Sequence, residues 1–262
     1  LCLNFPDEGS LVIETAEVGR EQAVAALNNI VIRLLAAAPP GRLQFTLLDP
    51  VELGQSFAGI MHLADYEDRL INSRIWTQPG QIEEQLARLN EHIEKVAQMY
   101  LRNEYATIAD YNRQAGRIAE KYHFLVIADF PANFSDLAAR RLQSILASGP
   151  RCGVFTLIHH DARRQMPADF VVEEMHKHCL RVRIGRNGVF LEGDPIEGLT
   201  ATLDTPPPPD LATPFLHKIG RASIDSNRVE VPFADVIPPE DQLWSLDTTT
   251  ELRVPIGRTG AT

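Results

Sequence analysis

The feature that most constrains the fold is a series of short apolar runs, each stopped by polar or turn-forming residues. Such runs are typical of strands that lie in the middle of a parallel sheet and are buried on both faces. The four clearest runs cover residues 11–13, 43–48, 124–128 and 153–158. They predict the central strands of an α/β domain.

Helical patterns separate these runs. Between residues 20 and 38, apolar side chains recur at spacings of three and four, and Pro39-Pro40-Gly41 ends the pattern. Strand, helix and strand in this order form a βαβ unit, so the two strands are expected to be parallel. Further helices are predicted over residues 82–102, 108–122, 137–146 and 170–177.

The pattern changes near residue 200. Before it, Gly185-Arg186-Asn187-Gly188 separates two β-type runs, and its Asn-Gly step predicts a hairpin. After it, residues 206–209 are all proline and predict a stiff spacer. Residues 210–262 show only short strand-like pieces. We therefore expect a domain over residues 1–200 and a proline-rich linker over residues 201–262.

Composition excludes several classes of protein. The chain has 262 residues, of which 44% are hydrophobic and 23% charged, as in soluble globular proteins. No apolar run reaches the roughly 18–20 residues that span a membrane. The formal net charge of −10 makes strong DNA binding by this segment alone less expected. Three scattered cysteines fit a reducing cytoplasm, and the start at Leu1 without a Met suggests an excised piece of a longer protein.

The turn between the first strand and the first helix stands where a phosphate loop would lie. Such a loop needs glycines, a Lys that neutralises phosphate and a Ser or Thr that holds Mg²⁺. Gly19 alone remains of the glycines, Gln22 stands in place of the Lys and Ala23 in place of the Ser or Thr. Moving the register by one residue recovers neither. Glu17 and Glu21 add negative charge that would repel phosphate. The candidate phosphate-loop residues are Gly19, Arg20, Glu21, Gln22 and Ala23.

An ATPase also needs acidic residues at the end of a strand. Ile127-Ala128-Asp129-Phe130 offers one carboxylate where a metal-binding Asp and a neighbouring base are required. No catalytic residue is therefore expected, with Asp129 as the candidate if the domain is active. Asp49 ends another strand at the edge where α/β proteins bind ligands, so it could bind a ligand or cap its own turn.

Histidines near the end of the fourth apolar run raise the question of a metal. His159-His160-Asp161 and the pair His176 and His178 are residue types that bind Zn²⁺. The two groups lie on different predicted elements, and no Cys or Glu spacing supports them. We therefore expect no metal site.

The order of these pieces resembles the FtsK/SpoIIIE family of DNA-pumping ATPases, which includes the EccC-type ATPases of type VII secretion. The resemblance runs from about residue 11 to residue 184. It rests on residues 25–35 (the helix after the phosphate loop), 45–53 (the second strand), 108–112 (a signature after the long helix), 124–134 (the acidic strand) and 153–160 (the sensor strand). It implies a P-loop NTPase-like (RecA/FtsK-like) fold, with a mostly parallel sheet covered by helices on both faces and a C-terminal linker containing short strands.

The chain also departs from that family. The sensor strand of the family usually ends in Ala-Thr-Gln-Arg-Pro, and here Asp161 replaces the Gln that senses the γ-phosphate. Phosphate loop, acidic strand and sensor depart together, so we expect a non-hydrolysing module without a cofactor. The alternative is a divergent ATPase that holds Mg²⁺ with Asp129 and Asp49, binds ATP and takes its lysine from another module. An unrelated α/β binding domain stays open and would show a different strand order.

The resemblance further implies partners. Residues 252–258 resemble the strand that opens another ATPase core, so we expect an intact phosphate loop to follow in the full-length protein. The implied partners are an adjacent ATPase module of the same chain, a ring-like homo-oligomer, and DNA or a secreted protein as the translocated substrate. The implied location is cytoplasmic, and the resemblance allows the full-length protein to be associated with a membrane.

Overall fold

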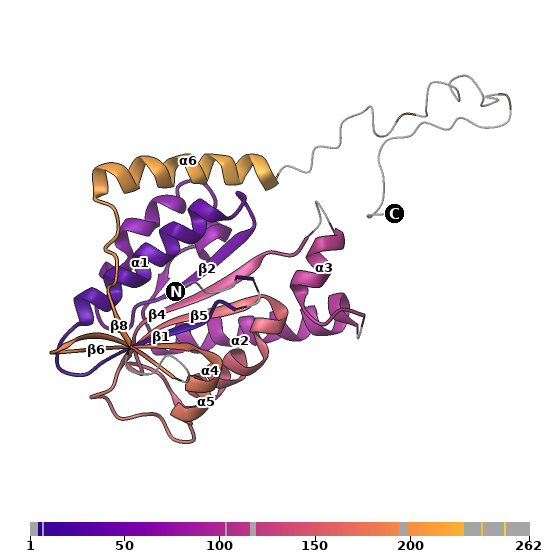
Figure 1. Ribbon diagram of the computed structural model, residues 1–262. Helices are drawn as coiled ribbons and strands as arrows, with labels where there is room; N and C mark the ends of the chain where they lie inside the picture. Colours follow the sequence, from indigo (N-terminus) through magenta and orange to yellow (C-terminus); the bar gives the residue numbers. More distant parts are fainter. Residues whose placement is uncertain are drawn as a thin grey trace.

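A computed structural model of the chain describes residues 5–6, 8–102, 104–115, 119–193, 199–227, 237 and 249. These residues form an eight-stranded sheet with the order β3-β2-β4-β5-β1-β6-β7-β8 (Figure 1). The strands are β1 (Leu11–Thr15), β2 (Leu43–Leu48), β3 (Ile75–Trp76), β4 (Tyr122–Phe130), β5 (Val154–Asp161), β6 (Leu180–Gly185), β7 (Gly188–Glu192) and β8 (Leu199–Ala201). Neighbouring strands pair in parallel along β3-β2-β4-β5-β1-β6. The pairs β6 with β7 and β7 with β8 are antiparallel. The predicted mostly parallel α/β sheet is confirmed.

Helices cover both faces of the sheet, each over its own apolar cluster. Helix α1, helix α6 and the 3₁₀ segment η1 (Gln55–Leu63) pack on one face, and α2, α4 and α5 pack on the other (Figure 1). The α-helices are α1 (Arg20–Ala37), α2 (Pro79–Lys95), α3 (Ile108–Ala115), α4 (Asp136–Ser148), α5 (Val172–His178) and α6 (Pro209–Asn227). A π-helical turn, η3 (Val96–Leu101), continues α2.

An aromatic ladder sets the register of the three neighbouring central strands. Phe45 of β2 is paired with Phe124 of β4, which is paired with Phe155 of β5. Their ring centroids lie 5.7 Å and 5.5 Å apart, and all three side chains are buried. Because side chains alternate along a strand, a slip of one residue would move these rings to the other face. The ladder therefore keeps the ends of the strands aligned.

Two boundaries differ from the sequence-based expectation. A helix is predicted over residues 108–122, and its described part ends at Ala115. Tyr122, the last residue of the predicted helix, is instead the first residue of strand β4. Only short strand-like pieces are predicted after residue 210, but residues 209–227 form helix α6. Pro209 occupies the first turn of this helix, where proline is tolerated because that N–H has no helical partner. The strand-like pieces predicted at residues 228–233 and 252–258 lie outside the described residues.

Helix α6 packs on the domain through η1 and the loop that follows it. Leu216 is buried in the apolar cluster on the α1 face, and the hydroxyl of Tyr66 is 2.8 Å from Nδ1 of His217. A side chain at Gly220 would meet the ring of Tyr66 at 2.3 Å, so glycine permits this close approach. The described part of the predicted linker thus contacts the core.

The connection from β1 to α1 depends on Gly19. Its φ of 98° lies in the left-handed region, and it caps the helix that starts at Arg20. A Cβ at this position would lie 2.4 Å from Cγ2 of Ile184 on the neighbouring strand β6. Gly19 therefore sets both the direction of the loop and its distance from the sheet.

We expect Gly19→Ala to lower the free energy of unfolding by about 2–5 kcal/mol, because it combines left-handed strain with overpacking. Gly193→Ala is the matched control, since Gly193 has φ 112° but an added Cβ there would meet no described heavy atom within 4 Å. It should cost only about 1–2 kcal/mol. Urea unfolding measures both, and equal losses would contradict the close contact with Ile184.

Candidate functional site

The candidate site lies at the carboxyl edge of the parallel strands, where open α/β sheets bind ligands. Strand β5 lies between β1 and β4, and Thr15 is paired with Asp161 at this edge. Asp129 lies near the end of β4, and Asp49 directly follows β2. The topology therefore brings the predicted candidates Asp49, Asp129 and Asp161 to one edge of the sheet.

A β-bulge determines where Asp129 points. The pairing of β4 with β5 shifts by one residue between Ile127 and Phe130, and Asp129 has a φ of 55°. Ala128 belongs to the cluster on the α1 face, so strict alternation would turn Asp129 toward the opposite face. Bulges re-aim side chains in this way. Asp129 instead contacts α1, while Phe130 packs into the cluster on the α4 face.

Arg20 and Asp129 form a bidentate ion pair. Nε of Arg20 donates to Oδ1 of Asp129 at 2.7 Å, and Nη2 donates to Oδ2 at 2.6 Å. The Asp129 side chain is 3% exposed and that of Arg20 31%. Burial alone would raise the pKa of Asp129, but the bidentate pair with Arg20 holds it well below its usual range. Arg20 also lies 3.6 Å from a carboxylate oxygen of Glu52.

His159 connects Asp129 with the end of β1. The main-chain N–H of Asp129 donates to Nδ1 of His159 at 3.1 Å, and Nε2 is 2.8 Å from Oγ1 of Thr15. The tautomer that carries its proton on Nε2 satisfies both hydrogen bonds. His159 is 1% exposed, so this bridge holds the bulge in place from inside the sheet.

The phosphate-loop candidates lie at the start of α1. The helix begins directly after Gly19, so Arg20 is the first residue after the loop glycine. The assignment of the Lys and the Ser or Thr positions to Gln22 and Ala23 stays a prediction. Gln22 is exposed in the first turn, and Ala23 is buried in the core. Glu21 lies in the first turn, where the helix dipole favours its negative charge.

The carboxylate of Asp49 is saturated by its own loop. It accepts hydrogen bonds from the main-chain N–H groups of Glu52 at 3.1 Å, Gly54 at 2.9 Å and Ser56 at 3.0 Å. Asp49 is fully buried. These bonds support its role as a cap for the turn after β2, one of the two roles left open by the sequence.

Asp161 is paired with arginines that follow it in the chain. Nε and Nη2 of Arg163 donate to its two oxygens at 2.8 Å and 3.0 Å, and Nε of Arg164 donates at 3.2 Å. The hydrogen bond from Arg163 lowers the pKa of Asp161. Asp161 is therefore an ionised and fully partnered group at the end of β5.

A second buried cluster lies on the opposite face and was not predicted as a unit. Oε1 of Glu14 lies 3.3 Å from Nδ1 of His160 and 2.7 Å from Nε2 of His176, and Oε2 lies 3.5 Å from Arg181. Burial alone would raise the pKa of Glu14, but the two histidines outweigh burial and lower it to about 2. The sequence hinted at this only through the alternation of β1 and β5, which places Glu14 and His160 on one face.

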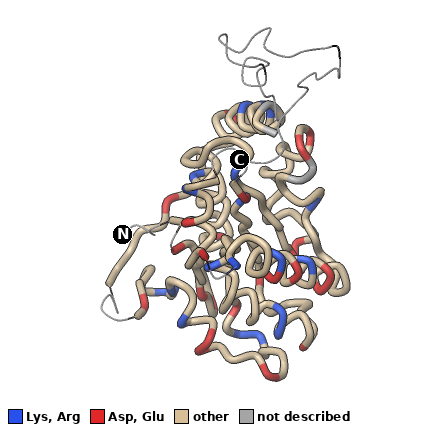
Figure 2. Tube along the Cα trace, turned by 90° about the vertical axis from the view of Figure 1, so that its right-hand side faces the viewer, with Lys and Arg blue, Asp and Glu red and all other residues tan. Residues whose placement is uncertain are grey.

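Charges elsewhere are mixed. In Figure 2, basic and acidic residues are interspersed along the chain. Acidic residues outnumber basic ones, which gives the formal net charge of −10. Among the described residues, the structure contains no helix with the length and apolarity to cross a bilayer.

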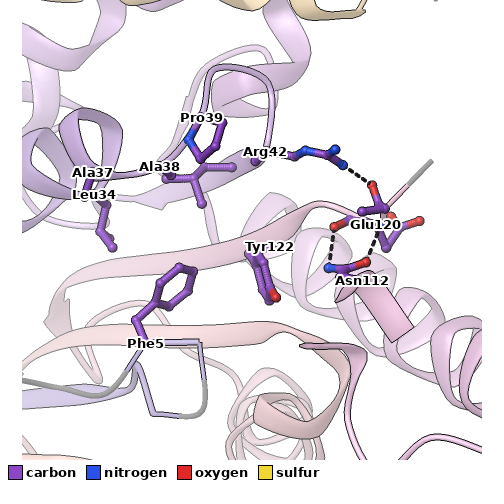
Figure 3. A pocket seen from close by; sticks show the side chains of 11 residues that line it. Phe5, Leu34, Ala37, Ala38, Pro39, Arg42, Asn112, Glu120 and Tyr122 are labelled. Carbon is purple, nitrogen blue, oxygen red and sulfur yellow. Dashed lines mark hydrogen bonds between the residues drawn. The ribbon is translucent and has the colours of Figure 1, made fainter. Parts of the chain in front are cut away.

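A pocket of about 330 Å³ lies at the other end of the strands, near the beginnings of β2 and β4. Phe5, Leu34 and Tyr122 form its apolar part, and Asn112 and Glu120 lie at its polar side (Figure 3). None of the predicted site residues lines it. The candidate site is therefore defined by its polar contacts at the carboxyl edge.

Several solved structures share this fold. EssC (ATPases 2 and 3) from Geobacillus thermodenitrificans matches with a TM-score of 0.59 and 11% identity over 85% of this chain and 45% of that one. Thermomonospora curvata EccC (ATPases 2 and 3) in complex with a signal sequence peptide matches with a TM-score of 0.55 and 14% identity over 86% and 44%. The pCW3 conjugation coupling protein TcpA with ATPγS matches with a TM-score of 0.50 and 14% identity over 68% and 49%.

These similarities confirm the resemblance to FtsK/SpoIIIE-type ATPases at the level of the fold. The chain spans less than half the length of each of these three structures. No protein-family model and no curated protein matches it. The fold shared with these ATPases does not support the alternative of an unrelated α/β binding domain.

We expect Arg20→Ala to lower the free energy of unfolding by about 2–4 kcal/mol, because it leaves the carboxylate of Asp129 nearly buried without its cation. The double variant Arg20→Ala/Asp129→Ala should lose clearly less than the sum of the single variants in a double-mutant cycle. Arg33→Ala is the control, since Arg33 pairs with Asp204 on the surface, where a pair contributes less than about 1 kcal/mol. Additive losses would show that the pair contributes nothing.

The cluster around Glu14 predicts a pH dependence. The pKa of Glu14 is about 2, below its usual value of 4.5. The ionised carboxylate therefore stabilises the fold fully above pH 4.5, and this stabilisation is lost as the pH falls toward 2. Wild type should exceed Glu14→Gln by on the order of 3 kcal/mol at pH 7, and the difference should shrink below about pH 4. Urea unfolding at several pH values measures this, with the surface variant Glu84→Gln as control. A difference that does not change with pH would contradict it.

Proposed function

We propose that the chain is a non-hydrolysing ATPase-like module of a multi-module translocase, with a structural and regulatory role toward an active neighbouring ATPase module. The bidentate pair between Arg20 and Asp129 carries this proposal. It joins the cation that follows the loop glycine to the acidic group at the end of β4. The two groups that would serve ATP therefore neutralise each other.

ATP hydrolysis in this fold requires a cation on the phosphates, a carboxylate that holds Mg²⁺ and a group that positions the attacking water. Each buried carboxylate at this edge already has partners: Asp129 has Arg20, Asp49 has three main-chain N–H groups, and Asp161 has two arginines. Glu21 adds negative charge in the first turn of α1. Nucleotide would have to displace these contacts and overcome that charge.

The guanidinium group of Arg20 strengthens its pair with Asp129. Its planar fork matches both oxygens of a carboxylate, whereas lysine acts as a point charge on a flexible stem. The pKa of Arg20 is raised, chiefly by its hydrogen bonds with Asp129. The Arg20–Asp129 pair is therefore stable without a ligand, which supports a structural role for the carboxyl edge of the sheet.

Apolar side chains on the rim of the site support contact with another module. Val18 lies in the loop before α1, and Val51 and Leu53 lie in the loop after β2. They are 43%, 38% and 74% exposed, and the ion pair of Arg20 with Glu52 links the two loops. Single exposed apolar residues are ordinary, but a group of them on linked loops favours an interface.

The wider context is also part of the proposal. EccC and EssC are described as chains with several ATPases, which supports an adjacent module in the full-length protein and a ring-like assembly. EccC is bound to a signal sequence peptide, and TcpA is a conjugation coupling protein, so a secreted polypeptide or DNA is the translocated substrate. The net charge of −10 favours placing any DNA contact outside this segment. The module is cytoplasmic in this scheme.

One observation favours the alternative of a divergent ATPase. Arg20 is a cation directly after the loop glycine, and it is partly exposed. If it left Asp129 and turned to the phosphates, Asp129 and Asp49 could hold Mg²⁺. ATP would then act as the switch that opens the ion pair.

Isothermal titration of the chain with ATP and Mg²⁺ decides between the two. We expect no binding at millimolar ATP, and no increase in the free energy of unfolding where a ligand at 100 times its Kd would add about 2.7 kcal/mol. Asp129→Asn serves as the matched variant. Tight binding by wild type that is lost in Asp129→Asn would support the divergent ATPase and overturn the proposed module.

A further inference from the structure

A cluster of three metal-ligand residue types lies at the amino end of β4. His92 comes from α2, Glu120 precedes β4, and His123 lies near the start of that strand. One donor atom from each lies within 4.8 Å of the other two. We infer that His92, Glu120 and His123 form a binding site for a divalent transition-metal ion, of which Zn²⁺ fits the ligand set best.

The donor set determines the choice of metal. Two imidazoles and one carboxylate suit Zn²⁺, which binds such donors at about 2.0–2.2 Å. Donors at these distances around a tetrahedral ion lie about 3.4 Å apart, so binding requires side-chain rotations that bring together donor atoms now within 4.8 Å of one another. Three protein ligands leave one position for water. Mg²⁺ and Ca²⁺ prefer oxygen donors throughout and do not match two imidazoles.

An unpaired nitrogen is the second, independent observation. Nε2 of His92 is buried and has no hydrogen-bond partner among the described residues. Buried polar atoms almost always have a partner, so an exception requires an explanation. The rings of His92 and His123 are stacked with centroids 4.2 Å apart and an interplanar angle of 29°. Because the lone pair of an imidazole nitrogen lies in the plane of its ring, one ring must turn before both nitrogens bind the same ion. A metal ion supplies the missing partner.

Charge around the cluster is mixed. Lys121, next to Glu120 in the chain, lies 3.7 Å from a carboxylate oxygen of Glu67. Glu120 supplies the one negatively charged donor of the proposed ligand set.

Neighbouring residues hold Glu120 in position. The side chain of Asn112 on α3 accepts from the main-chain N–H of Glu120 at 2.8 Å and donates to its carbonyl at 3.0 Å (Figure 3). Tyr100 lies beside the same residue: burial raises the pKa of Tyr100, and the carboxylate of Glu120 adds to the effect. Partners of this kind orient metal ligands and contribute to affinity.

The cluster around Glu14 differs from this group in its ion pairs. There, His160 and His176 both lie within hydrogen-bond distance of Glu14, and Nη2 of Arg181 lies 3.5 Å from the second oxygen. Nε of Arg181 is also buried without a partner among the described residues, so the lone Nε2 of His92 supports a metal site only together with the neighbouring donors of Glu120 and His123.

The site is remote from the phosphate-loop edge. His123 and Asp129 are six residues apart on one strand, which corresponds to about 20 Å. A metal here would tie the end of α2, just before the π-helical turn of residues 96–101, to the start of β4. Its role is therefore to fix the packing of this helix against the sheet, independently of any nucleotide.

Isothermal titration of the 262-residue chain with Zn²⁺ tests the site. We expect one equivalent to bind, and we expect His92→Gln, Glu120→Gln and His123→Gln each to weaken the affinity by at least about tenfold, since even partners of metal ligands contribute 10–100-fold. His62→Gln and His178→Gln are matched controls from other parts of the chain and should change the affinity less than about twofold.

Thermal unfolding of the same variants separates metal binding from loss of fold. Zn²⁺ should raise the Tm of wild type and of the two control variants, but not that of folded Glu120→Gln, whose side chain lies in a partly exposed connection. Absence of Zn²⁺ binding by wild type would overturn the site. So would variants of the three residues that fold and bind Zn²⁺ as tightly as wild type.

Discussion

Burial of the parallel strands on both faces determines the chemistry of this domain. All eight residues of β5 are buried, including its polar end at His159, His160 and Asp161. A buried charge or polar group is stable only when it is bonded, so each of these side chains must find partners on neighbouring elements. The strand order supplies them: β1 and β4 flank β5, with Thr15 and Glu14 on one side and Asp129 on the other. The contacts of the carboxyl edge follow from the topology.

The bulge in β4 allows Asp129 to reach the guanidinium group of Arg20. Without the extra residue, Asp129 would point toward the α2 and α4 face and could not reach α1. With it, both carboxylate oxygens meet Arg20, while His159 accepts the main-chain N–H that the bulge frees from the ladder. The backbone strain at a φ of 55° is therefore held by contacts on two elements. An edge stabilised so completely by its own residues has little need of a bound phosphate.

Sequence reasoning predicted what depends on local patterns and missed what depends on long-range geometry. Apolar runs located the central strands, and Asn187-Gly188 located the hairpin, because both signals lie within a few residues. The bulge at Asp129 has no local signature, since alternation alone predicts the opposite face. The pair of Arg20 with Asp129 joins residues 109 positions apart, so no local pattern indicates it. The group of His92, Glu120 and His123 joins a helix, a connection and a strand, and no spacing rule links them.

The two ends of β4 differ in whether their polar groups have hydrogen-bond partners. At the Asp129 end, carboxylates, imidazole and guanidinium groups satisfy one another, so the structure needs no further component there. At the His123 end, the same kinds of groups converge, but a buried nitrogen of His92 remains without a partner among the described residues. An unsatisfied buried polar atom destabilises the fold, and the proposed metal ion would satisfy this one. Strand β4 thus has a carboxyl end whose polar groups are partnered within the domain, and an amino end at which we propose that a metal ion binds.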